Sequence, residues 1–360
     1  MKPKILIVSN MYPSDKYPAY GIFVKNFIDN LSLNFDFTNV LIKGRQLSKL
    51  KKFITYIIFF LQVIYHAVFK KNDYLYVHYI SQVSVVLFFI YPFIRTKVIL
   101  NFHGSDMIGK FSTFKKIMFY FTKKISHKVD LIVVPSEFFK SKAIEVLGVD
   151  QNKVYVYPSG GINIELFYKK DKDTCRNLFG LKHDDFVIGM VSSIYIAKGW
   201  KVFLDAVSLL NDEIQNFKVL VAGYGIEEKE FLEYVKIKSL EDTVVYVGEK
   251  SHTELTEIYN SLDVFVFPTM LEESLGLVGL EAMACGIPVV GSNIGGLTDY
   301  IKNDYNGFLF NVCDSRDLAL KIKMCVKNKK LSKGAISTAL EFSSIKVALE
   351  LINKLKDLKC

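Results

Sequence analysis

The segment DVFVFPTMLEESLGLVGLEAMACGIPVVGSNIGG, residues 263–296, predicts a buried strand, a loop, a short helix and a second buried strand. The helix is expected to run from about Gly276 to Cys285. Gly286 then supplies the left-handed residue that ends many helices, with Pro288 just beyond it. A strand, a helix and a strand in this order favour two parallel strands of one sheet, because parallel strands need a long crossover connection.

Similar short apolar runs recur through the 360 residues, with helical patterns between them. Their apolar residues are continuous rather than alternating, as a parallel sheet covered on both faces requires. The sequence therefore predicts an α/β protein, and its length favours two domains. The expected strands are Lys4–Val8, Tyr74–Val77, Lys97–Asn101, Leu131–Pro135, Val154–Tyr157, Val187–Val191, Lys218–Ala222, Val244–Val247, Asp263–Phe267 and Pro288–Gly291. The charged stretch Tyr168–Asp173 is the best linker candidate.

The charge is uneven along the chain. Residues 1–170 hold 24 basic and 10 acidic side chains, whereas the whole chain has 46 and 37. A basic first half indicates an anionic partner for that half, such as a membrane surface, a nucleic acid or a phosphorylated substrate. The five cysteines form no CxxC pair, and the N-terminal run is too poor in apolar residues for a signal peptide. A reducing compartment, and hence the cytoplasm, is expected.

Two segments of the first half have the composition of helices that contact lipid. Phe53–Phe69 has 17 residues without a charge and is flanked by lysines on both sides. Because about 17 residues is the lower limit for a membrane span, we favour a buried or lipid-facing helix over one that crosses the membrane. Phe114–Lys128 has one apolar face and five lysines around it, the pattern of a basic helix at a membrane surface. An ordinary surface helix stays the alternative.

Two carboxylates flank the predicted helix start. Glu273 lies in the loop that leaves the first strand, at the edge of a parallel sheet where ligands usually bind. Glu281 lies just over one turn into the helix, and helical side chains lean toward the N-terminus. Both can therefore face one pocket, with free N–H groups of Gly276 and Leu277 between them. Carboxylates suit sugar hydroxyls and a helix N-terminus suits a phosphate; a solvent-facing Glu281 is the alternative.

Several motifs resemble those of one known family. Glu273 and Glu281 lie in ESLGLVGLEAMACGIPVV, which is similar to the E-x7-E signature and the EAMA-x-G-x-PVV run of the family-4 retaining glycosyltransferases of GT-B fold. Lys198-Gly199 resembles that family's donor-phosphate loop, and His103-Gly104-x-Asp106 resembles its HG-x-D element. Further matching landmarks are Tyr12-Pro13, Gly21, Pro158–Asn163 with Phe167, Gly223-Tyr224-Gly225, Val247-Gly248, Gly295-Gly296 and Asn306-Gly307.

The resemblance implies an architecture of two Rossmann-like, doubly wound α/β domains that face each other across a cleft. Residues 1–167 would form the N-terminal acceptor-side domain, and residues 168–340 the domain that binds a nucleotide-sugar donor. Residues 341–360 would form a C-terminal helix that returns to the first domain.

The resemblance also implies roles for matched positions. Glu273 would hold donor-sugar hydroxyls, and Glu281 the ribose hydroxyls of the nucleotide. Lys198 would neutralise the diphosphate leaving group. Gly21 would let the backbone approach that phosphate, since it has no side chain. His103 would lie beside the reacting carbon. The expected catalytic residues are His103, Glu273 and Lys198; the expected donor-binding residues are Gly21, Ser193, Lys198, Glu273, Gly276, Leu277 and Glu281.

One position departs from the family pattern. The family usually has an arginine five residues before the lysine, where this chain has Ser193. Lys198 and the helix end at Gly276 still supply positive charge for a departing diphosphate without a metal, so neither a metal nor a cofactor is expected. The acidic string Asp171-Lys172-Asp173 is predicted to be a solvated charge run rather than a metal site.

The sequence thus predicts a retaining, metal-independent hexosyltransferase. It would move a sugar from a nucleotide diphosphate-sugar to a glycan or lipid-linked glycan acceptor, in surface polysaccharide biosynthesis. Peripheral contact with an anionic membrane surface through Phe53–Phe69 and Phe114–Lys128 is expected, at the cytoplasmic face of the plasma membrane. No nucleic-acid recognition motif accompanies the basic half. The alternatives are a non-catalytic partner subunit of the same fold, which Ser193 favours, and another sugar-nucleotide enzyme such as an epimerase.

Overall fold

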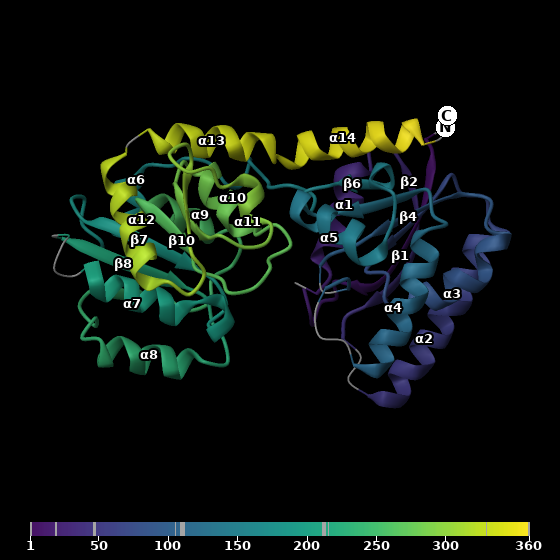
Figure 1. The fold of residues 1–360 in the computed structure, drawn as a ribbon, viewed down its shortest axis with the longest axis horizontal. Coiled ribbons are helices and arrows are strands. Elements are labelled where there is room, and N and C mark those ends of the chain that lie inside the picture. Colours follow the sequence, from purple (N-terminus) through teal and green to yellow (C-terminus); the bar gives the residue numbers. More distant parts are fainter. Residues whose placement is uncertain are drawn as a thin grey trace. The chain divides into compact units, whose positions relative to one another are not determined.

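The chain divides into two compact units in a computed structural model (Figure 1). The structure describes residues 2–358 except 19, 46–47, 105, 109–111, 211–213, 215 and 329. Unit 1 comprises Met1–Gly161 and Ile345–Cys360, and unit 2 comprises Ile162–Ser344. These limits differ by a few residues from the predicted boundaries at 167/168 and 340/341. The difference arises because Ile162 donates its N–H to the Phe342 carbonyl, and Ser344 donates to the Ile162 carbonyl.

Unit 1 is built on a parallel six-stranded sheet in the order β2-β1-β3-β4-β5-β6. Its strands are β1 (Lys4–Tyr12), β2 (Asp36–Lys43), β3 (Tyr74–His78), β4 (Lys97–Asn101), β5 (Leu131–Val134) and β6 (Val154–Val156). Its helices are α1 (Ile22–Leu31), α2 (Lys49–Ile64), α3 (Val83–Ile90), α4 (Thr113–Ser126), α5 (Glu137–Leu147) and most of α14 (Ser344–Asp357). A π-helical turn, Tyr65–Phe69, continues α2.

Helices cover both faces of this sheet. Buried residues of α2, α3, α4 and α5 pack on one face, around strand residues such as Leu6 and Val77. Residues of α1 and α14 pack on the other face, around Ile7 and Tyr76. Tyr74 also donates its hydroxyl hydrogen to the Leu355 carbonyl of α14. Because both faces of the sheet are covered, its central strands are apolar along their length, as a doubly wound sheet requires.

Unit 2 repeats this plan with the order β12-β11-β10-β7-β8-β9, again parallel. Its strands are β7 (Phe186–Val191), β8 (Phe217–Ala222), β9 (Val244–Tyr246), β10 (Val264–Phe267), β11 (Val289–Ser292) and β12 (Gly307–Phe310). Its helices are α6 (Lys172–Asn177), α7 (Trp200–Leu210), α8 (Glu228–Ile237), α9 (Leu255–Ser261), α10 (Leu277–Ala284), α11 (Leu297–Tyr300), α12 (Ser315–Lys327) and α13 (Leu331–Glu341). Two apolar clusters bury its two faces.

The structure confirms the predicted α/β class and every predicted strand. It adds two strands that the sequence analysis missed, β2 and β12, and each lies at one edge of its sheet. Edge strands are covered less completely: only Val40 and Ile42 of β2 are buried, and its first four residues are mostly polar, so its sequence lacks the longer apolar run of the central strands. The strand β12 has only four residues and begins with Gly307, so its apolar run is too short to indicate a strand.

The helix Lys49–Phe69 belongs to the fold of unit 1 and also has an apolar outer side. Phe59, Val63 and Ala67 are buried in the core. By length and composition alone, the whole helix could cross a membrane, and no other described helix meets the same criteria. Its exposed apolar residues are Leu50, Phe53, Ile54, Ile57, Ile58, Leu61, Tyr65 and Phe69. One side of this helix is therefore buried, and the opposite side is apolar and exposed; contact of that side with lipid stays a prediction.

Candidate functional site

Glu273 and Lys198 form a close ion pair in unit 2. The Lys198 Nζ lies 2.6 Å from the Glu273 Oε1, and the Thr269 hydroxyl donates to the same oxygen at 2.9 Å. The two charged side chains are 24% and 17% exposed, so a ligand can still reach them. The structure thus brings together two residues that are 75 positions apart in sequence.

Backbone contacts at the ends of β7 and β10 fix this pair. Lys198 ends a 3₁₀ turn after β7, and Gly199 follows with a φ of 81°. A Cβ at Gly199 would lie 1.8 Å from the Pro268 carbonyl oxygen, so no other residue fits there without a backbone shift. The Met270 N–H donates to the Ala197 carbonyl, which ties the lysine turn to the loop that carries Glu273.

Glu281 is buried within α10, so the solvent-facing alternative is wrong. Its side chain accepts a hydrogen bond from the Tyr259 hydroxyl at 3.0 Å, and the His252 Nε2 lies 3.2 Å from its other oxygen. The hydrogen bond to Glu281 raises the pKa of His252 above its usual value, despite partial burial. Burial, and then Glu281, raise the pKa of Tyr259 well above its usual value, so this hydroxyl keeps its proton and donates.

Tyr300 connects the surroundings of both carboxylates. Its hydroxyl donates to the Gly276 carbonyl at 3.0 Å. Its pKa is raised by burial, then by Glu273 and by Glu281, so both negative charges act on one hydroxyl. Gly276 is the N-cap of α10, and the N–H groups of Gly276 and Leu277 have no hydrogen-bond partner among the described residues. Free donors and two carboxylates thus surround the start of this helix.

His103 follows β4 in unit 1 and stacks on a second histidine. Its Nε2 lies 3.2 Å from the Nδ1 of His78, and the Phe23 ring centroid is 4.1 Å from its own. Burial lowers the pKa of His103 to about 3, and burial together with His103 lowers the pKa of His78 well below its usual value. Both imidazoles are therefore uncharged at neutral pH, and His103 can act there as a hydrogen-bonding group rather than as a cation.

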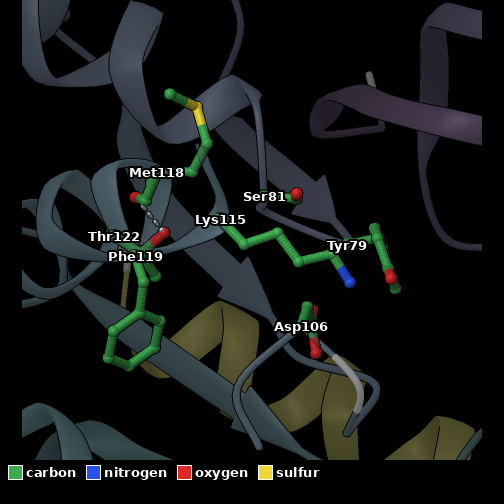
Figure 2. A pocket seen from close by; sticks show the side chains of 7 residues that line it. All are labelled: Tyr79, Ser81, Asp106, Lys115, Met118, Phe119 and Thr122. Carbon is green, nitrogen blue, oxygen red and sulfur yellow. Dashed lines mark hydrogen bonds between the residues drawn. The ribbon is translucent and has the colours of Figure 1, made fainter. Parts of the chain in front are cut away.

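Asp106 organises the loop after β4. Its Oδ1 accepts the backbone N–H of His103 at 3.0 Å, whereas its buried Oδ2 has no partner. Burial raises the pKa of this carboxyl to about 7, and hydrogen bonds from backbone N–H groups oppose the rise. Figure 2 shows the small pocket beside it, with Lys115 of α4 reaching toward Asp106 and Tyr79. Asp106 thus holds His103 in place from the same loop.

Gly21 and Ser193 complete the predicted set. Gly21 is the N-cap of α1 with a φ of 73°, and a Cβ there would lie 2.5 Å from the Met11 carbonyl carbon. Packing of the α1 start against the end of β1 thus requires this glycine, and its role toward a phosphate stays a prediction. Ser193 follows β7 and is exposed.

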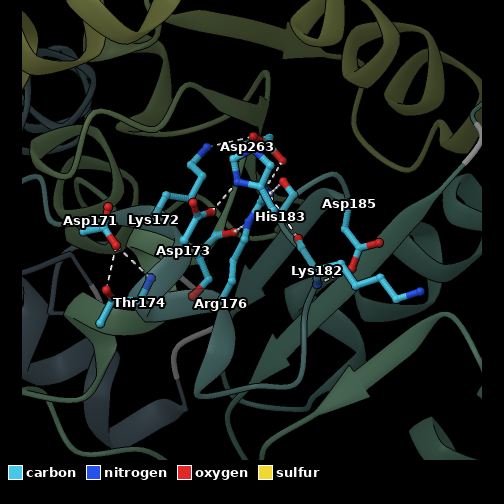
Figure 3. Close-up of polar contacts among 10 residues, drawn as sticks. Asp171, Lys172, Asp173, Thr174, Arg176, Lys182, His183, Asp185 and Asp263 are labelled. Carbon is cyan, nitrogen blue, oxygen red and sulfur yellow. Dashed lines mark hydrogen bonds and ion pairs between the residues drawn. The ribbon is translucent and has the colours of Figure 1, made fainter.

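The acidic string at 171–173 lies at the surface, as predicted for a solvated charge run, and its side chains form hydrogen bonds and ion pairs there (Figure 3). Asp171 caps α6 by accepting from the Thr174 N–H and hydroxyl. Lys172 pairs with Asp263, and Asp173 pairs with His183. In the described part of the chain, no group of three or more His, Cys, Asp or Glu residues is arranged to hold a metal ion.

The partners of the expected residues could not be predicted from the sequence. No motif in the sequence points to His78 or His252, which contact His103 and Glu281. Tyr259 and Tyr300 carried no signal, because buried aromatic residues between apolar runs are typical of any core. These partners are 22 to 29 residues apart in sequence, so a local motif cannot reveal that they are in contact.

Two family models match this chain. Residues 27–164 match the model described as Glycosyltransferase Family 4, and residues 171–342 match the one described as Glycosyl transferases group 1. The chain is 29% identical over 241 residues to a D-inositol 3-phosphate glycosyltransferase of Stackebrandtia nassauensis. It is 30% identical over 223 residues to CapM of Staphylococcus aureus, a capsular polysaccharide biosynthesis glycosyltransferase.

These matches cover 63% and 61% of this chain, but only 54% and 58% of the two relatives. The chain thus spans little more than half the length of those relatives. The structure of Anabaena HepE in complex with UDP and glucose superimposes with a TM-score of 0.78, over 99% of this chain and all of that one, at 18% identity. At this identity the likeness shows the fold alone, and it confirms the predicted GT-B class.

Proposed function

Because the chain belongs to the family-4, group 1 glycosyltransferases, we propose that it transfers a hexose from a nucleotide diphosphate-sugar to a glycan or lipid-linked glycan acceptor. We include in this proposal that the anomeric configuration of the sugar is retained and that no metal takes part. The similarity to CapM favours a role in surface polysaccharide assembly. The observation that carries the proposal is the Lys198–Glu273 pair.

The chemistry of the transfer explains why such a pair is needed. Expelling a nucleoside diphosphate develops negative charge, which preorganised positive groups stabilise best in a partly enclosed site. Lys198 and the free N–H groups at the start of α10 would supply this stabilisation. When a diphosphate binds to Lys198 in place of Glu273, the Glu273 carboxylate would be free to accept hydrogen bonds from sugar hydroxyls. Glu281, held by Tyr259, would accept those of the ribose.

His103 would lie beside the donor sugar in this reaction. As an uncharged imidazole it would hydrogen-bond to a sugar hydroxyl near the reacting carbon without adding charge. His78 and Asp106 would position it, the first by stacking and the second through its backbone N–H.

Nucleotide binding tests the proposal directly. UDP, GDP, dTDP and ADP are added in turn, and thermal unfolding is followed through Trp200, the single tryptophan, which is buried in unit 2. A nucleotide at 100 times its Kd stabilises the fold by about 2.7 kcal/mol. We expect one nucleotide to raise the unfolding midpoint by several degrees, UDP being the first candidate by analogy with HepE.

Two variants locate the binding. Lys198→Ala is expected to abolish most of the shift, whereas Lys201→Ala is expected to leave it unchanged, because Lys201 lies over the Tyr234 ring instead. If none of the four nucleotides stabilises the wild type, the donor function is contradicted. The non-catalytic alternative, which Ser193 favours, then takes its place.

We further propose that unit 1 binds an anionic membrane at the cytoplasmic face through α2 and α4. Exposed Phe114, Ile117 and Tyr120 of α4 extend the apolar side of α2, and lysines surround both helices. In Figure 1, α2, α3 and α4 lie side by side. Apolar side chains at a lysine-rich surface suit the boundary between acyl chains and anionic headgroups.

Vesicle sedimentation tests this contact. Ile54→Asp with Ile58→Asp is expected to weaken binding to phosphatidylglycerol vesicles by at least about tenfold, because two apolar side chains no longer enter the lipid. The matched control is Ile345→Asp with Leu349→Asp on α14, which has the same spacing and similar exposure. Equal loss in both double variants would refute a contact through α2.

A further inference from the structure

Two adjoining cavities in unit 1 lie beside α2. The first, here called the polar pocket, is lined by Asn10, Tyr20, Ile42, Gly44, Arg45, Lys52 and Tyr56. The second, here called the apolar groove, is lined by Lys49, Lys52, Phe53, Tyr56, Phe60, Gln82, Val85, Val86, Phe114 and Met118. Lys52 and Tyr56 line both, so the two cavities meet at one turn of α2.

The polar pocket offers positive charge and an unused acceptor. Neither Arg45 nor Lys52 pairs with a carboxylate among the described residues; Arg45 instead lies over the Tyr20 ring. Asn10 is 6% exposed, and its amide group donates to Gln82 at 2.8 Å. The Asn10 carbonyl oxygen is buried without a partner. Such an oxygen is costly unless a ligand donates a hydrogen bond to it.

The apolar groove runs between α2, α3 and α4. Aromatic and aliphatic side chains form its walls, and its charged residues, Lys49 and Lys52, both come from the first turns of α2. A hydrocarbon chain can fill such a groove if its polar end lies at these lysines. One groove that ends at one basic pocket suits a single chain rather than the two chains of a diacyl lipid.

The polar pocket also lies at the edge of the sheet where the strands have their carboxyl ends. Asn10 is near the carboxyl end of β1, and Gly44 and Arg45 follow β2 directly. His103 follows β4 at the same edge, because all strands of this sheet are parallel. A ligand group in the polar pocket therefore lies on the side of the sheet where His103 is found.

We propose that the polar pocket and the apolar groove together bind the acceptor, a sugar carried on a single-chain prenyl phosphate or diphosphate. The hydrocarbon chain occupies the apolar groove, Arg45 and Lys52 bind the phosphate, and a sugar hydroxyl donates to the Asn10 carbonyl oxygen. This inference rests on the proposed function and adds the class of acceptor to it.

Binding of farnesyl phosphate, measured by calorimetry without a donor, tests the site. Charge-assisted hydrogen bonds and chain burial both contribute, so farnesol and inorganic phosphate are each expected to bind at least about tenfold more weakly. Lys52→Gln is expected to lower the affinity about tenfold, whereas Lys51→Gln, one residue away and outside both cavities, is not. Phe53→Asp is expected to lower it, whereas Phe93→Asp, equally exposed at 64%, is not.

The outcomes separate this inference from the proposed function. If farnesyl phosphate binds and Lys52→Gln and Phe53→Asp weaken it selectively, the prenyl phosphate site holds even where the nucleotide panel fails, and only its role as an acceptor site is lost. If a nucleotide stabilises unit 2 but both variants bind farnesyl phosphate as the wild type does, the acceptor site is wrong and the donor function stands. Equal binding of short-chain diacyl phosphatidate would overturn the assignment to a single chain.

Discussion

Replacing Glu273 by glutamine is expected to lower kcat/KM for the sugar nucleotide by about 10² to 10³. The substitution keeps the shape of the side chain and removes its charge. The glutamine then makes neutral hydrogen bonds to sugar hydroxyls, and each lost charge-assisted bond costs about 1.5–3 kcal/mol. Lys198→Ala should have a loss of similar size, because one preorganised donor to a developing charge contributes about 10² to 10³ in kcat.

Hydrolysis of the sugar nucleotide, in which water takes the sugar and nucleoside diphosphate is released, measures both variants without knowledge of the acceptor. Glu272→Gln is the matched control, since Glu272 is the adjacent carboxylate and is exposed. Unfolding of the variants, followed through Trp200, separates a catalytic loss from a folding defect. A Glu273→Gln protein that keeps a third or more of the wild-type kcat/KM would show that the donor sugar is held elsewhere.

The central strands and the α10 region could be predicted from sequence because their signals are local. A continuous apolar run indicates a strand covered on both faces, and Gly276 and Gly286 mark the two ends of α10. The motif around Glu273 and Glu281 is equally compact. The edge strand β2 could not be predicted in this way, since only Val40 and Ile42 of its eight residues are buried and its apolar run, Val40–Ile42, is short.

The electrostatic surroundings of the site could not be predicted, because they depend on contacts between distant segments. The pairing of Lys198 with Glu273 joins the ends of β7 and β10, which become neighbours only when the sheet forms. The low pKa of His103 comes from burial, a property of the whole unit rather than of its motif. The motif identifies these residues, and the structure in addition shows which of them carry charge and which are neutral.

Asp263→Ala is expected to destabilise unit 2 by about 3–5 kcal/mol, the usual cost of leaving one member of a buried ion pair without its partner. Arg176 is 3% exposed, and its Nη2 lies 2.6 Å from the Asp263 Oδ2. Asp263 also accepts from Lys172 at 2.7 Å (Figure 3), and from the Val187 N–H of β7 at 2.7 Å. The aspartate thus joins α6, β7 and the start of β10.

Urea unfolding followed through Trp200 measures this loss within unit 2. Asp173→Ala is the matched control, because its pair with His183 is largely exposed and such pairs contribute about 0–1 kcal/mol. A loss below about 1 kcal/mol for Asp263→Ala would refute the assigned role, since a buried guanidinium without its carboxylate costs more than that.

A double variant distinguishes the stability cost of the unpaired Arg176 charge from the cost of lost packing. If the cost of Asp263→Leu comes from the isolated Arg176 guanidinium, then Arg176→Met in that background should recover a large part of it. An apolar pair of similar volume often replaces a buried ion pair at little cost. If Arg176→Met instead adds a further loss, the contacts of Arg176 with the Ser261 and His183 carbonyls hold the segment, and the pairing with Asp263 is secondary.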